Sequence, residues 1–240
     1  MKNGELTIES AKKKQKKLSI DESPNKAAYW GEGESVPFMF LAKGLDEISQ
    51  VNGRIVMTEI LCNMLRTVME TTPHDLVALV YLLVNRIAPA HHGMELGLGD
   101  ASIIKALAQA SGSKQSLIKN QYKELGDLGL VAKASRSSQP LMRKPEPLTV
   151  AKVFDKFHII AKESGKDSQE KKKNHIKSLL VAAIDCEPLY LIRLLQTKLR
   201  IGLAEQTLLT ALGHAAVYSG KRFSSPRHVE SPLEEVGHCS

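Results

Sequence analysis

The chain has 240 residues, of which 42% are hydrophobic and 5% aromatic, so it can bury a core as one large domain or two small ones. Its net charge of +7 and pI near 9.2 favour an acidic partner, nucleic acid above all. No apolar run reaches the ~18 residues of a membrane span, and the N-terminus is too polar for a secretory signal. The three cysteines lack the spacing of a disulfide framework or a zinc site, so we expect an intracellular protein without a metal.

The N-terminal segment, residues 1–26, has no periodic apolar residues and is expected to be disordered. Its basic run is a nuclear import signal, a loose DNA contact or a linker that keeps the chain soluble. The run consists of Lys12, Lys13, Lys14, Lys16 and Lys17. Gln15 and Leu18 resemble the start of a sliding-clamp-binding box, but Asp21 and Glu22 stand where its aromatic pair belongs, so no complete box is present.

Folded sequence begins near Ala27, where Trp30 is expected to anchor the entering chain against the core. His91 and His92 are interpreted as loop residues, because adjacent histidines cannot easily share one helical face and no carboxylate or thiol completes a metal site. Helical apolar spacing predicts three helices before them, over Val36–Ile48, Ile55–Met69 and His74–Ile87.

A glycine turn that opens a helix occurs twice, 105 residues apart. It reads Leu-Gly-Leu-Gly-Asp at residues 96–100 and Ile-Gly-Leu-Ala-Glu at residues 201–205. The first amides of a helix have no partner within it, and the helix dipole is positive there, so each turn is a candidate backbone site for a phosphate. Alternatively, the glycines only shape a tight turn and the acids only cap the helix.

Between the two copies we expect a basic helix over Gln115–Leu125 and then a loop of hydroxyls and cations over residues 133–139. Arg136 and Ser138 of that loop have the chemistry to bind phosphate oxygens, unless the loop is simply flexible.

The second half repeats the plan of the first. Residues 151–157 match residues 42–48 in type, and a lysine-rich turn over residues 168–173 takes the place of the turn at residues 52–54. Helices over Ile176–Ile184 and Leu189–Leu199 follow. The predicted fold class is therefore all-α, with two pseudo-twofold-related helical bundles forming one domain over residues 27–220. The helical pattern ends near Lys221, so residues 221–240 are expected to be a tail.

The charges near the two glycine turns differ. Lys198 and Arg200 precede the second copy, whereas Met94 and Glu95 precede the first, so the second turn is the stronger candidate for a phosphate site. Arg54 and the lysines at 171–173 are further candidates for phosphate contacts, because we expect them to lie at equivalent turns of the two halves. Alternatively, both turns are simply cationic and solvated.

Three stretches together resemble the N-terminal DNA-binding domain of eukaryotic ATP-dependent DNA ligases, most closely the replicative DNA ligase I type. They are residues 95–100, 130–138 and 199–206, and the resemblance covers about residues 27–218. It implies an all-helical, pseudo-symmetric domain that binds the minor groove of DNA on both sides of a nick. It also implies a role in DNA replication, repair and recombination in the nucleus. The phosphate-contacting positions of the family would fall on Gly97, Gly99, Lys198, Arg200, Gly202 and Ala204, with Arg54 as a weaker transfer.

The sequence also departs from that family. The adenylylated lysine of the catalytic domain stands in a Lys-x-Asp-Gly motif, which occurs nowhere in these 240 residues, and the residues after Gly220 diverge from the family's last helices. We therefore expect a truncated form that binds DNA without ligase chemistry, with ATP and magnesium needed only by the missing catalytic domain. The alternative is a helical protein-interaction scaffold whose basic surface meets an acidic protein.

Overall fold

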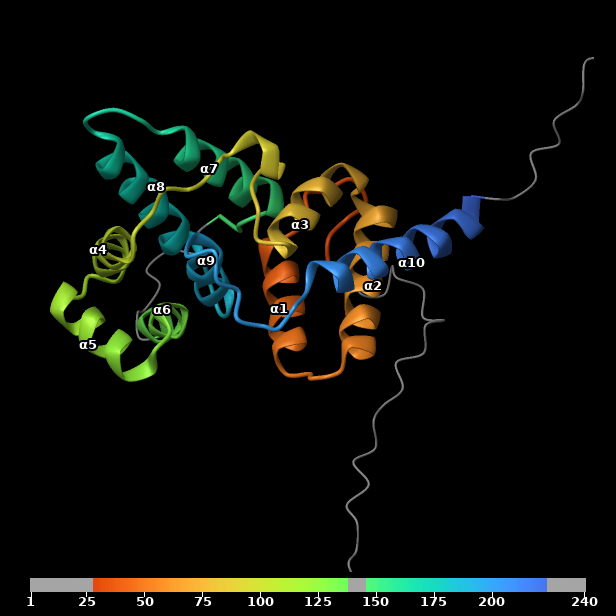
Figure 1. Cartoon of the computed structure of the whole chain (residues 1–240), viewed down its shortest axis with the longest axis horizontal. Helices are drawn as coiled ribbons and strands as arrows, with labels where there is room; N and C mark the ends of the chain where they lie inside the picture. Colours follow the sequence, from red (N-terminus) through yellow and green to blue (C-terminus); the bar gives the residue numbers. More distant parts are fainter. Residues whose placement is uncertain (1–27, 138–145, 224–240) are drawn as a thin grey trace, which may run out of the picture.

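The computed structural model describes residues 28–137 and 146–223, and over these ranges the chain is helical and contains no β-strand (Figure 1). The predicted all-α fold class is confirmed. In chain order the elements are α1 (Phe38–Ser49), α2 (Arg54–Thr71), η2 (Pro73–Asp75), α3 (Leu76–Leu83), η3 (Ala90–His92), α4 (Asp100–Ser111), α5 (Gln115–Leu125), α6 (Leu128–Ser137), α7 (Val150–Lys162), α8 (Ser168–Ala182), α9 (Glu187–Leu195) and α10 (Glu205–Phe223).

A reciprocal pair of backbone hydrogen bonds joins the starts of α1 and α7. The amide of Phe38 donates to the carbonyl of Leu148, and the amide of Val150 donates to the carbonyl of Val36, both at 2.8 Å. The residues of this contact correspond at a spacing of 112 in the chain, as a local two-fold relation requires. The same spacing relates the buried apolar residues of the two helices, which are Phe38, Leu41, Leu45 and Ile48 in α1 and Val150, Val153, Phe157 and Ile160 in α7.

This spacing corrects the predicted match of residues 42–48 with residues 151–157, which lies three residues, or almost one helical turn, out of step. A slip of one turn keeps the apolar positions on the same face, so residue types alone do not detect it. At the observed spacing Arg54 corresponds to Lys166 rather than to the lysines at 171–173. The arrangement of the whole domain as two pseudo-twofold-related bundles remains a prediction.

The helix that follows each glycine turn packs on the other half of the chain. Helix α4 packs against α8, and α10 packs against α2 and crosses it (Figure 1). Apolar residues at helical spacing make both contacts, since Ile103 and Leu107 of α4 and Leu208 and Ala211 of α10 are almost fully buried. The two halves are therefore interlocked, and each glycine turn is the point where the chain crosses over.

Two expected non-helical stretches are helical. The lysine-rich segment at residues 168–173 is the start of α8, because lysine is a good helix former and the actual turn is made earlier by Gly165 at φ +87°. Residues 133–137 of the expected loop belong to α6, since Leu128, Val131 and Ala132 bury the face that holds this helix in place.

Other helix boundaries moved by a few residues. Helices α3 and α9 end four residues before their predicted ends, and α10 continues through Phe223, past the predicted end of the pattern at Lys221. Trp30 is the expected anchor: its indole Nε1 donates to Thr72 Oγ1 at 3.1 Å and its ring meets Phe40 edge to face. The predictions for residues 1–26, Ser138 and most of the tail lie outside the described residues.

Candidate nucleic-acid interface

The two glycine turns have matching backbone structures. Gly97 and Gly202 adopt φ values of +59° and +66°, a left-handed conformation that a side chain disfavours. Two residues later, Gly99 and Ala204 cap their helices: each carbonyl accepts hydrogen bonds from the amides three and four residues ahead. All four residues are exposed. The sequence repeat therefore forms two similar helix N-termini, whose first amides are unused within the helix and open to an anion.

The acidic residue that begins each helix is engaged by other side chains, one of which comes from the other half of the chain. Asp100 accepts hydrogen bonds from Tyr122 at 3.1 Å and from Gln196 at 2.7 Å. Glu205 forms an ion pair with Arg86 at 3.0 Å. Asp100 does not make the side-chain cap that the alternative interpretation assigned to it, since Gly99 caps α4 without a side chain and Asp100 lies inside the helix.

Lys198 is an exposed cation beside the second turn. Its amide donates to the carbonyl of Arg193 just as the amide of Arg86 donates to the carbonyl of Tyr81, so Lys198 and Arg86 are equivalent positions in the two halves. Arg86 is held by Glu205, whereas no hydrogen bond or ion pair engages the ammonium group of Lys198 within the described part of the chain. Lys198 is thus available to a phosphate.

Arg200 is also exposed, but its guanidinium group is partly committed. Its Nη1 donates to the carbonyl of Gly126 at 2.8 Å, and its backbone has the unusual φ of +55°. An arginine has five N–H donors, so this contact orients the group and leaves donors for an anion.

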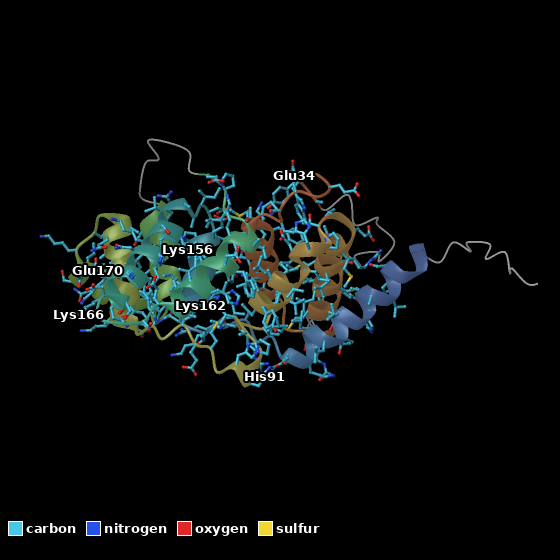
Figure 2. The ribbon with its side chains drawn as sticks, turned by 90° about the horizontal axis from the view of Figure 1, so that it is seen from above. Glu34, His91, Lys156, Lys162, Lys166 and Glu170 are labelled. Carbon is cyan, nitrogen blue, oxygen red and sulfur yellow. The ribbon has the colours of Figure 1, made fainter. Side chains whose placement is uncertain are left out.

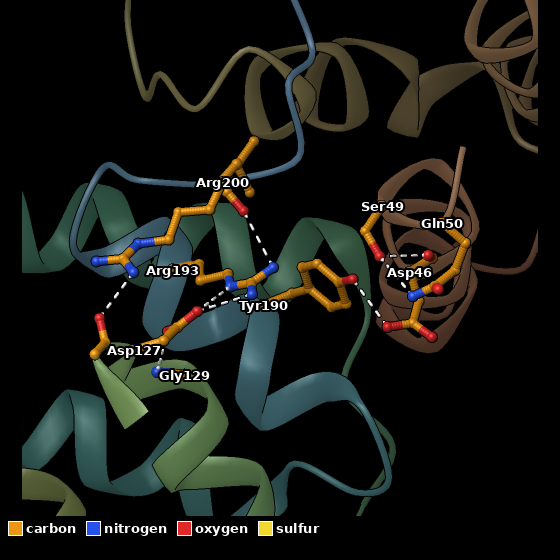
Figure 3. Close-up of polar contacts among 10 residues, drawn as sticks. Asp46, Ser49, Gln50, Asp127, Gly129, Tyr190, Arg193 and Arg200 are labelled. Carbon is orange, nitrogen blue, oxygen red and sulfur yellow. Dashed lines mark hydrogen bonds and ion pairs between the residues drawn. The ribbon is translucent and has the colours of Figure 1, made fainter. Parts of the chain in front are cut away.

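Arg193 is the principal residue of this region that sequence reasoning missed. Its guanidinium group bonds the carboxylate of Asp127 at 2.8 and 3.0 Å and donates to the carbonyl of Leu199 at 3.3 Å (Figure 3). It also lies 5.6 Å from the centre of the Tyr190 ring. The only signal in the sequence is an arginine within the apolar helix Glu187–Leu195, a position that requires a buried partner.

The partners of Arg193 are themselves fixed. Asp127 accepts a hydrogen bond from the amide of Gly129 at 2.8 Å, and the phenol of Tyr190 donates to Asp46 at 3.0 Å (Figure 3). Burial raises the pKa of Tyr190 above its ordinary value of 10.0, so the phenol stays protonated and remains a donor. This network connects α1, the α5–α6 turn, α9 and the approach to the second glycine turn.

The first glycine turn is held by a different cation. Lys172 of α8 is 6% exposed, and its ammonium group donates to the carbonyl of Leu96 at 2.9 Å. A Cβ on Gly97 would lie 3.2 Å from that ammonium group. The first turn therefore has a cation next to it, which the sequence did not indicate because Lys172 is distant in the chain.

The other predicted contacts are placed less favourably. Arg136 donates to the carbonyls of Val181 and Ala183, both at 2.9 Å, so it caps the end of α8 from within α6. Lys171 pairs with Glu163 and Lys173 with Glu170. Figure 2 shows Lys166 and Glu170 at the same end of the molecule, so the cations of this region are interspersed with acids.

Arg54 is exposed at the first position of α2 and lies on a groove between α2 and α10. The groove has a volume of about 530 Å³ and is also lined by Thr207, Thr210 and His214 of the second repeat helix. Arg54 is therefore on the same side of α10 as residues that closely follow the second glycine turn.

Two further findings concern metals and membranes. Within residues 28–137 and 146–223 no group of three histidine, cysteine or acidic side chains is placed to hold a metal ion.

His91 and His92 form part of η3 with their rings 4.5 Å apart, and His91 projects from the edge of the molecule opposite Glu34 (Figure 2). In the same ranges no helix combines the length and the apolar character needed to cross a bilayer.

The sequence is similar to known DNA ligases. The family described as DNA ligase N terminus matches residues 37–213. DNA ligase 1 of Arabidopsis thaliana is 62% identical over 221 residues, which are 92% of this chain and 28% of that protein. DNA ligase 1 of Dictyostelium discoideum is 46% identical over 81% of this chain and 16% of its own length, and a DNA ligase of Cenarchaeum symbiosum is 33% identical over 84% of this chain and 34% of its own.

Proposed function

Because the chain belongs to the DNA ligase N-terminal family, we propose that it is a DNA-binding module whose two glycine turns bind backbone phosphates of duplex DNA. The observation that carries this proposal is the matching structure of the turns. Gly97 and Gly202 have the same left-handed conformation, and each precedes an exposed helix N-terminus. The net charge of +7 adds a general attraction for a polyanion.

The second turn makes the stronger contact in this proposal. Lys198 supplies an unengaged ammonium group, Arg200 supplies an oriented guanidinium group, and the amides after Gly202 supply hydrogen-bond donors. At the first turn the amides after Gly99 act beside the buried charge of Lys172. Phosphate contacts position a protein on DNA but do not read bases, so we propose little sequence preference.

The finer features of the proposal come from the family resemblance. We propose that the two turns bind on the minor-groove side, on either side of a nick, and that the protein acts in DNA replication, repair and recombination in the nucleus. The proposed role of this chain is binding, so incubation with labelled ATP is expected to give no covalent adenylyl-protein. The printed sequence contains no Lys-x-Asp-Gly motif that would accept the adenylyl group.

A salt titration of binding to nicked and intact duplexes of the same sequence tests the proposal. The logarithm of the binding constant should fall linearly with the logarithm of salt concentration. Lys198→Ala and Arg200→Ala should each weaken binding and reduce the magnitude of that slope by ~1. Lys152→Ala is the matched control, because it removes a cation of α7 that already pairs with Glu146.

The proposal fails if Lys198→Ala and Arg200→Ala bind both duplexes as the unmodified protein does at every salt concentration. Equal affinity for nicked and intact duplexes would contradict the proposed nick preference but not the proposed phosphate contacts. Tight binding to an acidic protein that DNA cannot displace would favour the interaction scaffold instead.

A further inference from the structure

We propose that Arg193 is a positioning residue that presets the second glycine turn for phosphate binding. This inference rests on the proposed function. Arg193 reaches no solvent-facing anion site itself, since its side chain is only 12% exposed. It acts through the backbone at Leu199, which presents the Arg200 side chain.

The segment that Arg193 holds has a strained backbone. Within six residues, Thr197, Arg200 and Gly202 have φ values of +56°, +55° and +66°. Two of the three carry side chains, and a Cβ disfavours this conformation. Such residues keep a left-handed backbone only where surrounding contacts determine it.

Two contacts fix this segment to the α5–α6 turn. Arg193 donates to the carbonyl of Leu199, immediately before Arg200, while its other nitrogens bind the buried carboxylate of Asp127. One residue away from Asp127, the carbonyl of Gly126 accepts from the Arg200 side chain. Arg193 therefore fixes the backbone on one side of Arg200, and Gly126 fixes its side chain, as the dashed contacts show (Figure 3).

The first half has no such arginine. Tyr81 occupies the position equivalent to Arg193, and its ring stacks on Phe154 instead of binding the chain near residue 96. There the carbonyl before the glycine is held by Lys172. At each site a cationic side chain thus donates to a backbone carbonyl at or just before the turn. This argues that both sites require a fixed backbone.

A turn that is already ordered in the free protein binds an anion more tightly, because binding does not have to supply the conformational entropy lost on ordering it. Loss of Arg193 should then weaken DNA binding without removing a phosphate contact. This differs from the loss of Arg200, which removes a cation from the interface.

A double-mutant cycle on nicked-duplex binding separates these effects. The variants are Arg193→Lys, Arg200→Ala and the double substitution, each checked for unmodified helix content and thermal unfolding. A lysine keeps the positive charge at residue 193, but one nitrogen cannot span both Asp127 and the Leu199 carbonyl. We expect Arg193→Lys to weaken binding roughly 5- to 10-fold with an unchanged salt slope.

The decisive result is the effect of Arg193→Lys in the Arg200→Ala background. If Arg193 acts through this segment, the double variant should bind less than about twofold more weakly than Arg200→Ala alone. Effects that multiply would overturn the proposal, as would unchanged binding by Arg193→Lys. If Arg200→Ala and Lys198→Ala both bind as the unmodified protein does, the proposed phosphate site itself is wrong.

A second variant keeps the test informative if Arg193→Lys does not fold. Asp127→Asn keeps an acceptor for the Gly129 amide and removes the negative charge that orients Arg193. It should show the same unchanged slope and the same dependence on Arg200. Independent effects of Asp127→Asn and Arg200→Ala would contradict the positioning role.

Discussion

The ammonium group of Lys172 lies 2.9 Å from the carbonyl oxygen of Leu96, the first residue of the first glycine turn. This contact joins α8 of the second half to the crossover segment of the first half. The lysine is almost completely buried, so its charge is poorly screened by solvent. A turn that has only Glu95 and Asp100 as charged neighbours in the sequence therefore has a positive charge beside it in the folded protein.

Lys172→Met tests whether that charge matters for DNA. Methionine has a similar length and removes the ammonium group, so binding to a nicked duplex should weaken roughly 2- to 5-fold, the size of a charge effect near a helix terminus. The free energy of unfolding should change by less than about 2 kcal/mol, because the variant no longer has to desolvate a buried charge and this gain offsets the lost hydrogen bond. Urea denaturation and a binding titration measure both quantities. Unweakened DNA binding would show that Lys172 only supports the fold.

Alanine at the two left-handed glycines should destabilise the domain. Gly97→Ala and Gly202→Ala each place a Cβ on a residue at positive φ, which costs about 1–2 kcal/mol. Gly99→Ala is the matched control, because Gly99 has φ −93° and open space around its Cβ position, and Ala204 is its natural equivalent. Its unfolding free energy should stay within about 0.5 kcal/mol of the original, as lost chain entropy and weaker capping offset one another. Equal midpoints in urea for all three variants would contradict the assignment of the turns.

Gly129 marks a close approach of α6 to α9. A Cβ there would lie 2.7 Å from the backbone carbonyl oxygen of Leu189, which cannot rotate away, so Gly129→Ala should destabilise by about 1–3 kcal/mol. Gly213→Ala provides the contrast. It lies exposed in α10 with nothing within 4 Å of its Cβ position, and it should stabilise by about 0.5–1 kcal/mol. Thermal unfolding of the two variants measures both effects. A stabilised Gly129→Ala variant would rule out the tight α6–α9 contact.

Glu187 should make stability depend on pH. Burial raises the pKa of its carboxyl group from 4.5 to about 7, with Asp185 adding to the shift and the amide of Ile184 opposing it. The folded state then binds a proton that the unfolded state has released, so unfolding free energy should fall as pH rises from about 4.5 to 7, by on the order of 3 kcal/mol. Glu187→Gln keeps an acceptor for Ile184 and should remove this decline. Parallel pH profiles for the two proteins in urea denaturation would disprove the assignment.

Helix positions were predictable because they depend on local spacing. Leu41, Leu45 and Ile48 recur at helical intervals in the predicted helix and are buried in α1. The helical nature of residues 133–137 was not predictable in this way. Their polar composition suits a loop, and the helix continues because its first turns are buried and Arg136 contacts the end of α8.

The sequence by itself determined the all-α class, the repeated glycine turn and its position at two helix starts. These features follow from apolar spacing and from the conformational freedom of glycine, both of which are local. Only the tertiary structure decided that α4 packs on α8 and α10 on α2, and that Lys172 lies beside the first turn. Lys172 reaches the first turn from a distant helix, and Arg193 is oriented toward Leu199 by the distant Asp127. Such contacts depend on the packed arrangement of helices rather than on the residues next to each turn.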